Sequence, residues 1–158
     1  SQQLARMDGD EIIPLIEGAT YLFANEYEAA LIEQKTGWSS ADIAGMVDTR
    51  VTTLGPDGAR VERRGEAPVT VKVAEEDRKA DPTGVGDAFR AGFLAGQAWG
   101  VGDERSAQVG ALLATYVIET IGTQEYELAR THFLERMART YGDDAAADVE
   151  PHVSCPRP

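Results

Sequence analysis

The sequence has little of several features on which whole classes of protein depend. It has a single cysteine, Cys155, which excludes an intrachain disulfide and suits a reducing cytoplasm. No run of apolar residues approaches the roughly 18 that a membrane-spanning helix needs. The N-terminal residues, Ser1 to Met7, lack the charged and then apolar pattern of a signal peptide. We therefore expect a cytoplasmic protein with no membrane partner.

Positive charge is also scarce. The 158 residues include 15 Lys and Arg against 27 Asp and Glu, which gives a formal net charge of −12. Such a balance argues against binding to nucleic acid or to an anionic membrane surface. It does not exclude a nucleotide ligand, because backbone amides at the start of a helix can hold phosphate groups.

The order of the expected elements predicts an α/β fold that ends in a helical block. Only two strands with buried character alternate with helices, which is fewer than an α/β sheet normally has. Half of the sheet is therefore expected to be missing. A polar start without an initiator Met leads to the same expectation, that the chain begins inside a larger protein. The expected strands are 19–24, 49–54, 59–64 and 69–73, and the expected helices are 11–17, 26–36, 40–47, 87–99, 106–121, 128–141 and 143–149.

The stretch from Asp81 to Phe89 is the most informative in the chain, because a glycine-bearing loop there leads directly into a helix. Gly84 and Gly86 permit positive φ angles and a close approach of the backbone. The amides from Gly84 to Asp87, with the positive end of the helix dipole, could then form an anion hole for a phosphoryl group. Asp87 would lie at its mouth, where it could accept a proton from an attacking hydroxyl.

Two better-known phosphate-binding patterns do not fit this loop. The Walker pattern G-x-x-x-x-G-K-[ST] is absent, and a dinucleotide G-x-G-x-x-G pattern would need glycine where Phe89 stands. On spacing alone, an ordinary loop and helix cap explains the stretch as well as an anion site does.

The same stretch resembles the C-terminal signature of the PfkB (ribokinase-like) carbohydrate kinase family. Three further segments resemble that family in order and spacing. Asn25 to Glu28 matches its N-x-x-E element, Thr53 to Gly58 its strand and turn along the nucleotide, and Gly122 to Gln124 its loop near the adenine and the monovalent cation. The run from Val117 to Glu125 looks most like bacterial adenosine-kinase-type members.

The resemblance implies the C-terminal part of a ribokinase-like three-layer α/β/α fold over residues 1–150, followed by an irregular tail, 151–158. It implies an ATP-dependent phosphotransferase acting on a primary hydroxyl of a nucleoside or sugar, with adenosine as the first choice. The alternatives are a ribokinase- or fructokinase-type sugar kinase and a non-catalytic nucleotide-binding fragment. The N-terminal half of a family member, with its lid and most acceptor contacts, is absent, so the chain is expected to need it. At full length a homodimer is possible.

The resemblance also implies roles for individual residues. Asp87 would be the catalytic base, and Gly84, Val85 and Gly86 would form the anion hole with the Asp87 amide. Val85 stands where many members carry alanine, which leaves the amide available. The residues expected to border ATP are Asn25, Thr53, Leu54, Gly55, Asp57, Gly58 and Gly86.

Metal ions are implied as well. Glu28 would order Mg²⁺ and its waters, and Asp81 and Thr83 would supply oxygens to a K⁺-like ion in members that use one. Each role has a simpler alternative: Glu28 as an acid in the first turn of a helix, Asp81 as a loop cap, and Thr53 to Gly58 as a plain hairpin turn. Arg78 and Lys79, just before the signature, are weaker candidates for nucleotide contact.

Other features have structural interpretations. Gly92, Gly96 and Gly100 recur at every fourth residue and predict a ridge that a neighbouring helix or strand can approach closely. Phe89 and Phe93 share one helical face and are expected in the core. His132 is expected at the surface. His152 and Cys155 alone do not make a zinc site, which normally has four ligands.

Overall fold

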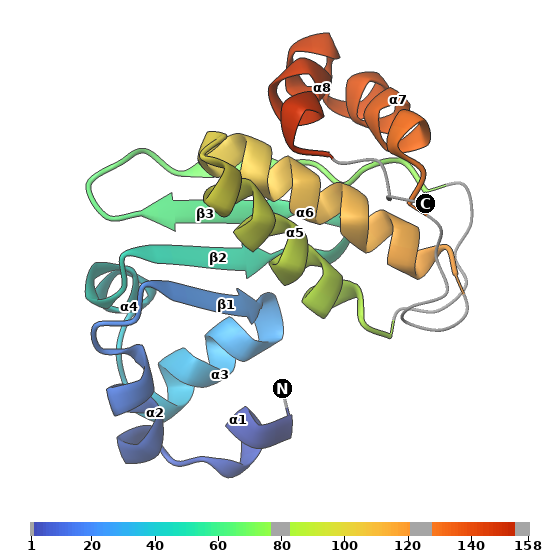
Figure 1. The fold of residues 1–158 in the computed structure, drawn as a ribbon. Coiled ribbons are helices and arrows are strands. Elements are labelled where there is room, and N and C mark those ends of the chain that lie inside the picture. The colour runs from blue at the N-terminus through green and yellow to red at the C-terminus, as the bar shows by residue number, and fades with distance from the viewer. Residues whose placement is uncertain (1, 77–82, 121–127, 154–158) are drawn as a thin grey trace. The chain divides into compact units, whose positions relative to one another are not determined.

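The computed structural model describes residues 2–76, 83–120 and 128–153 of the chain. These residues form two compact units, one up to Thr70 and the other from Val71 onward. Figure 1 shows the elements of both units, and each unit is described by itself. None of the described helices is long and apolar enough to cross a membrane.

The first unit begins with two short helices, α1 (Gln2–Arg6) and α2 (Gly9–Ile16), and continues with α3 (Glu26–Thr36) and α4 (Ser40–Met46). The expected bounds of α3 are confirmed, since Asn25 caps its N-terminus and Gly37, with φ of 73°, closes it in the left-handed conformation. Ser39 caps α4 through its hydroxyl, as expected. The sequence pattern did not predict α1, because its five residues carry no apolar period.

Four strands form the sheet: β1 (Tyr21–Asn25), β2 (Thr49–Thr53), β3 (Ala59–Arg63) and β4 (Val69–Val71). Their order is β1-β2-β3-β4. β1 and β2 are parallel and β2 and β3 antiparallel, so the two strands that alternate with helices are the parallel pair. The expected α/β arrangement of this unit is confirmed.

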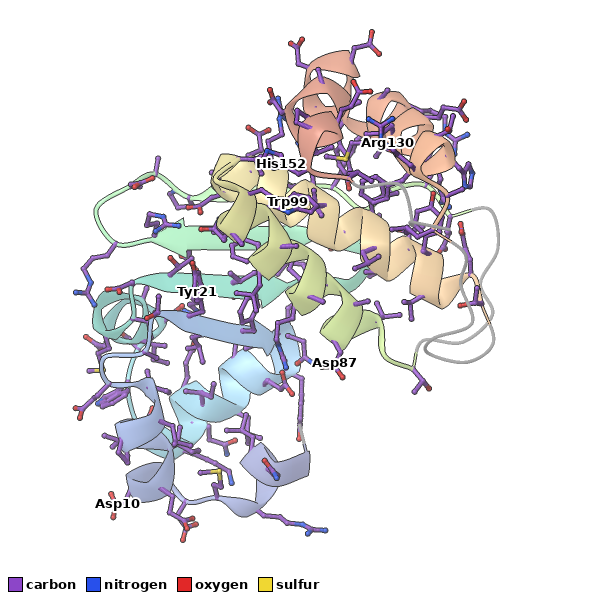
Figure 2. The ribbon with its side chains drawn as sticks, in the orientation of Figure 1. Asp10, Tyr21, Asp87, Trp99, Arg130 and His152 are labelled. Carbon is purple, nitrogen blue, oxygen red and sulfur yellow. The ribbon has the colours of Figure 1, made fainter. Side chains whose placement is uncertain are left out.

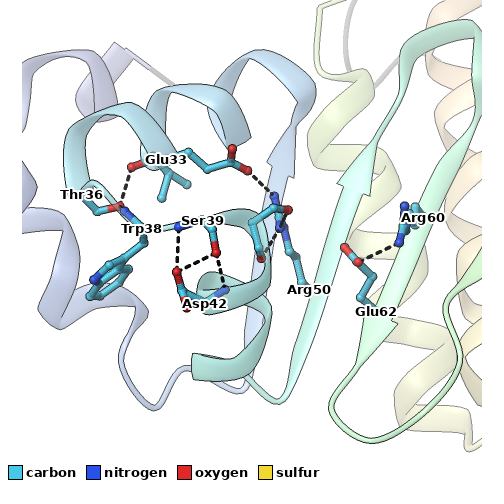
Figure 3. A network of polar contacts seen from close by, with 10 residues as sticks. Glu33, Thr36, Trp38, Ser39, Asp42, Arg50, Arg60 and Glu62 are labelled. Carbon is cyan, nitrogen blue, oxygen red and sulfur yellow. Dashed lines mark hydrogen bonds and ion pairs between the residues drawn. The ribbon is translucent and has the colours of Figure 1, made fainter.

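A buried arginine links the helices of the first unit to the sheet (Figure 3). Arg50 of β2 is 4% exposed, and its guanidinium donates to both the carbonyl and the hydroxyl of Ser40. It also lies 3.6 Å from the carboxylate of Glu33. The start of α4 and the last turns of α3 are thereby held against the same strand. The apolar core of this unit contains Ile12, Ile16, Ile32, Ile43 and Val47.

The second unit is the expected helical block: α5 (Val85–Trp99), α6 (Gly102–Ile118), α7 (Arg130–Tyr141) and α8 (Asp143–Val149). α5 and α6 begin earlier than the sequence pattern indicated. α6 takes Asp103 and Glu104 into its first turn, where acids favour the helix dipole. A 3-10 turn, η2 (Glu150–His152), includes the start of the expected irregular tail.

The predicted glycine ridge is the contact between α5 and α6. A Cβ added to Gly92 would lie 2.7 Å from the Cα of Gly110, and one added to Gly96 would lie 2.6 Å from the Cα of Ser106. Both glycines therefore allow the two backbones to approach closely. Gly100 is not part of this ridge: it has φ of 75° and caps the C-terminus of α5, with nothing near its missing side chain.

The predicted aromatic core positions on α5 are confirmed. Phe89 and Phe93 are 4% and 0% exposed, and their rings stack with centroids 6.5 Å apart. A second cluster joins α6, α7 and α8. It contains Ala74, Val109, Leu112, Tyr116, Phe133, Met137, Ala145 and Val149.

Replacing Gly92 by alanine should destabilise the second unit. The added methyl group would lie within 3 Å of the backbone of α6, so one helix must shift, at a cost of about 1–3 kcal/mol in the free energy of unfolding. Urea unfolding followed by fluorescence of Trp99 on α5 would measure the loss. Gly86→Ala in the same helix is the matched control, because nothing lies within 4 Å of its added Cβ. Equal stability of the two variants would contradict the role given to Gly92.

Candidate functional site

The N-terminus of α5 presents a group of backbone donors. Gly84 is the capping residue, with φ of 84°, and its carbonyl accepts the first helical hydrogen bond, from the amide of Ala88 at 2.9 Å. The amides of Val85, Gly86 and Asp87 consequently have no acceptor within the helix. Their donors and the positive end of the helix dipole favour an anion at this point.

The two glycines of this turn have different roles, which corrects the expectation that both take positive φ. Only Gly84 has a left-handed conformation. Gly86 lies inside the first turn of α5 with a φ that any residue adopts, and no heavy atom lies within 4 Å of the position of its missing Cβ. Gly86 therefore keeps the space beside the amides open.

Asp87 is the exposed acid of this turn (Figure 2). Its side chain is 84% exposed, and one carboxylate oxygen lies 3.4 Å from the guanidinium of Arg90. The carboxylate can therefore reach a ligand at the amides without displacing any packed side chain. Sequence reasoning missed Arg90 as its partner, although the spacing of three residues on a helix was a signal for such a pair.

The rest of α5 holds this turn in place. The residues after Asp87, Ala88 and Phe89, are both buried, and a Cβ on Gly110 of α6 would lie 2.6 Å from the carbonyl oxygen of Phe89. The candidate anion site therefore lies at the end of a helix that is packed along its length, which suits a preorganised group of donors.

Asn25 and Glu28, in the first unit, form a capping box at the start of α3. The Glu28 amide donates to the Asn25 side-chain oxygen at 2.8 Å, and the Asn25 amide donates to the Glu28 carboxylate at 3.1 Å. The N-x-x-E element thus has a structural role of its own. A role of either residue near phosphate or metal stays a prediction.

The structure brings a second predicted segment close to Asn25. Asn25 and Thr53 are register partners at the carboxyl ends of the parallel strands β1 and β2. The turn that follows Thr53 is a 3-10 turn, η1 (Gly55–Asp57), closed by a bond from the Leu54 amide to the Gly58 carbonyl at 2.8 Å. Gly55, Pro56 and Asp57 are exposed at this edge. Ligands of open α/β sheets bind outside this end of the strands.

The candidate metal ligands receive limited support. Among the residues that the structure describes, no three His, Cys, Asp or Glu side chains come together as a metal site. Glu28 alone suits only a Mg²⁺ ion that is held mostly by phosphate oxygens and water. Thr83 is exposed, whereas Asp81 lies outside the described residues, so the K⁺ site stays a prediction. Arg78, Lys79, Gly122 to Gln124 and Cys155 also lie outside them.

The two histidines have structural partners. His132 is exposed, as expected, and its Nδ1 lies 3.1 Å from the hydroxyl of Tyr116. Burial raises the pKa of Tyr116, and the nearby Arg136 guanidinium acts in the opposite direction. His152 stacks on Trp99 with ring centroids 5.4 Å apart, and both are labelled in Figure 2. Each histidine thus has an aromatic partner within the second unit.

Comparison with known families gives one match that covers most of the chain. The model of the pfkB family of carbohydrate kinases matches residues 5–129, which include both the α5 turn and the segments around Asn25 and Thr53.

Known proteins similar to this chain include nucleoside kinases. That of Methanocaldococcus jannaschii is 28% identical over 123 residues, which are 78% of this chain and 40% of the relative. The nucleoside kinase of Burkholderia thailandensis, solved with inosine, has 34% identity and a TM-score of 0.85 over 90% of this chain and 47% of the relative. The adenosine kinase of Sinorhizobium meliloti has 27% identity and a TM-score of 0.65, over 76% and 37%. The chain thus spans less than half the length of these relatives.

Replacing Gly86 by valine should abolish anion binding at α5 without unfolding the protein. Gly86 needs no positive φ and its surroundings are open, so valine is tolerated in the helix but occupies the space beside the amides. Calorimetric titration with pyrophosphate would measure the loss. Gly45→Val in α4, another helical glycine with open surroundings, is the control. Unchanged pyrophosphate affinity in Gly86→Val would show that this turn binds no anion.

Proposed function

The chain belongs to the pfkB family of carbohydrate kinases, and we propose that it supplies the C-terminal, nucleotide-binding half of an ATP-dependent kinase acting on a primary hydroxyl of a nucleoside. The observation that carries the proposal is the first turn of α5. It combines three amides without helical acceptors, a glycine that leaves the space beside them open, and an exposed carboxylate. Phosphoryl transfer to an alcohol requires a holder for the phosphoryl charge and an acceptor for the hydroxyl proton.

The proposed step assigns these two tasks to neighbouring residues. The acceptor hydroxyl attacks the γ-phosphorus, a new P–O bond forms, and the bond to the ADP oxygen breaks. Asp87 accepts the proton that the hydroxyl loses. The amides of Val85, Gly86 and Asp87 donate to the phosphoryl oxygens as charge accumulates on them. Because these donors belong to a packed helix, they need no reorganisation during the step.

Arg90 is proposed to orient the base. Its guanidinium contacts one oxygen of the Asp87 carboxylate at 3.4 Å. An exposed pair of this kind contributes little to stability, so its value would lie in limiting the side-chain conformations of Asp87. The other carboxylate oxygen could then face the acceptor.

The first unit is proposed to serve the nucleotide. Asn25, Glu28 and the turn from Thr53 to Gly58 gather at the carboxyl ends of β1 and β2, the usual ligand-binding edge of a parallel sheet. Mg²⁺, when bound with ATP, would neutralise phosphate charge, and Glu28 is the residue that would order its waters. A K⁺-like ion near Asp81 and Thr83 remains part of the proposal.

Adenosine is the proposed acceptor, and a free sugar such as ribose or fructose is the runner-up. The similarity to an inosine-bound nucleoside kinase and to an adenosine kinase supports a nucleoside. We further propose that the chain acts in the cytoplasm. It is also proposed to need an N-terminal half, because it spans less than half the length of these relatives. On this proposal the 158 residues alone are catalytically silent.

Phosphate transfer from labelled ATP tests the proposal. The chain would be assayed alone and with the N-terminal half of the Burkholderia thailandensis nucleoside kinase, with adenosine, inosine, ribose and fructose as acceptors. We expect activity only with both halves, and highest on adenosine. Asp87→Asn should lower kcat by about 10²–10⁴-fold, because the amide cannot accept the proton. Asp144→Asn, an exposed first-turn acid of α8, is the control.

Half or more of the wild-type kcat in Asp87→Asn would refute its role as the base. Turnover by the chain alone at the rate of a complete kinase would show that it needs no second half. A preference for ribose or fructose would replace the nucleoside by the sugar.

Glu28→Gln should raise the Mg²⁺ concentration needed for activity without destabilising the protein. Glutamine at this position completes a capping box as glutamate does, so the start of α3 is preserved while the charge is lost. The Mg²⁺ dependence of kcat in the two-half assay would measure the effect. Glu11→Gln, at the same position in the α2 capping box, is the control. An unchanged Mg²⁺ dependence would leave Glu28 with its capping role alone.

A further inference from the structure

Arg136 on α7 is a fully buried charge away from the turn described above. It is 1% exposed, and its two terminal nitrogens donate to the two carboxylate oxygens of Glu119 at 2.7 and 2.8 Å. Such a forked pair fixes both partners in orientation as well as in distance. The guanidinium carbon also lies 4.8 Å from the centre of the Tyr116 ring, which gives a cation–π contact.

The same guanidinium holds a piece of backbone that leads to the candidate anion site. Its Nη2 donates to the carbonyl oxygen of Glu75 at 2.7 Å. One residue earlier, the carbonyl of Ala74 accepts from the hydroxyl of Thr115 at 3.5 Å, and Ala74 is itself buried. The backbone at Ala74 and Glu75 is thus tied to both α6 and α7.

The other partner of Arg136 is Glu119, at the end of a neighbouring helix. Glu119 is the C-terminal capping residue of α6, and α6 is the helix that contacts α5 at Gly92 and Gly96. Because Gly96 lies against Ser106 and Gly92 against Gly110, α6 runs antiparallel to α5, and its C-terminal end lies toward the first turn of α5. Arg136 therefore joins this end of α6 to α7 and to the backbone at Glu75. One side chain connects three segments that are distant in sequence.

Stability alone is a poor explanation for this arrangement. Removing two charges from water is costly, and apolar side chains of similar volume are often equally stable in place of a buried pair. The planar fork of arginine, however, can donate to both oxygens of a carboxylate and to a backbone carbonyl together, as it does here. The charge is therefore best explained by the position that it imposes on the backbone.

We infer that Arg136 is a positioning residue, which holds the end of α6 through Glu119 so that α5, packed against α6, keeps its first turn in its anion-binding arrangement. The inference rests on the proposed function in so far as that anion is the phosphate of ATP. It predicts that apolar residues can replace the Arg136–Glu119 pair without loss of folding stability. The first turn of α5, however, should then lose its fixed position.

Two variants of the 158-residue chain separate these effects. Arg136→Met should lower the urea midpoint strongly, because the half-buried Glu119 carboxylate loses the guanidinium that neutralises it. The double variant Arg136→Met with Glu119→Leu should recover most of that loss. In both variants, hydrogen exchange of the amides at 84–88 should rise roughly tenfold and the Kd for Mg·ATP should rise by a similar factor, because the end of α6 has lost its polar contact with α7.

Arg130→Met is the matched control. Arg130 is on the same helix and also donates to a backbone carbonyl, that of Val153 at 2.9 Å, but this contact does not involve α6. In the Arg130→Met variant, the hydrogen exchange of the amides at 84–88 and the Kd for Mg·ATP should equal those of the wild type. Figure 2 labels this residue.

Other outcomes would overturn either the inference about Arg136 or the proposed function. A double variant with recovered stability, wild-type exchange and wild-type ATP affinity would overturn the inference and leave the pair a stabilising contact. The same rise in amide exchange and in the Kd for Mg·ATP in Arg130→Met would also overturn the inference, because any variant that loosens α7 would then produce the effect. If the wild-type chain alone and its two-half assembly both fail to bind Mg·ATP, the proposed function fails, and exchange at 84–88 then decides the role of Arg136 by itself.

Discussion

The close approach of α5 and α6 is the contact on which the second unit depends. Gly92, Gly96 and Gly110 remove the side chains that would separate the two backbones. With the helices in this position, Phe89 and Phe93 are buried and the first turn of α5, directly before Phe89, is left to present its amides. The site at Gly84 to Asp87 is thus a consequence of helix packing, because a helix held along its length keeps its first turn in place.

Charge in this chain is used in two contrasting ways. At Asp87 a carboxylate is exposed and loosely paired, which suits the proposed transfer of a proton from a ligand. At Arg136 the charge is buried and held by both oxygens of the half-buried Glu119 carboxylate, as suits a group that fixes the backbone. The excess of acids over bases in the composition reveals neither use, because burial and partners decide what a charge does.

Much of the local structure could be predicted from the sequence, and the reasons are local. Asn25 and Gly37 delimit α3 because one side chain caps amides and one glycine accepts a left-handed φ. The Gly92 and Gly96 ridge was predicted from spacing, although its partner on α6 was not. The pattern erred where a residue has two possible roles: Gly86 was expected to need positive φ and is helical, and Gly100 was expected in the ridge and is a cap.

The sequence by itself determined the α/β class, the glycine-led turn before Asp87 and the resemblance to a kinase family, since each depends on neighbours along the chain. Only the tertiary structure decided that Asn25 meets Thr53 across parallel strands and that Gly92 meets Gly110 across helices. It alone joined Arg136 to Glu119 and Glu75. Those partners are separated by 17 to 61 residues. No local propensity encodes a hydrogen bond whose acceptor is a distant backbone carbonyl, because every residue carries one.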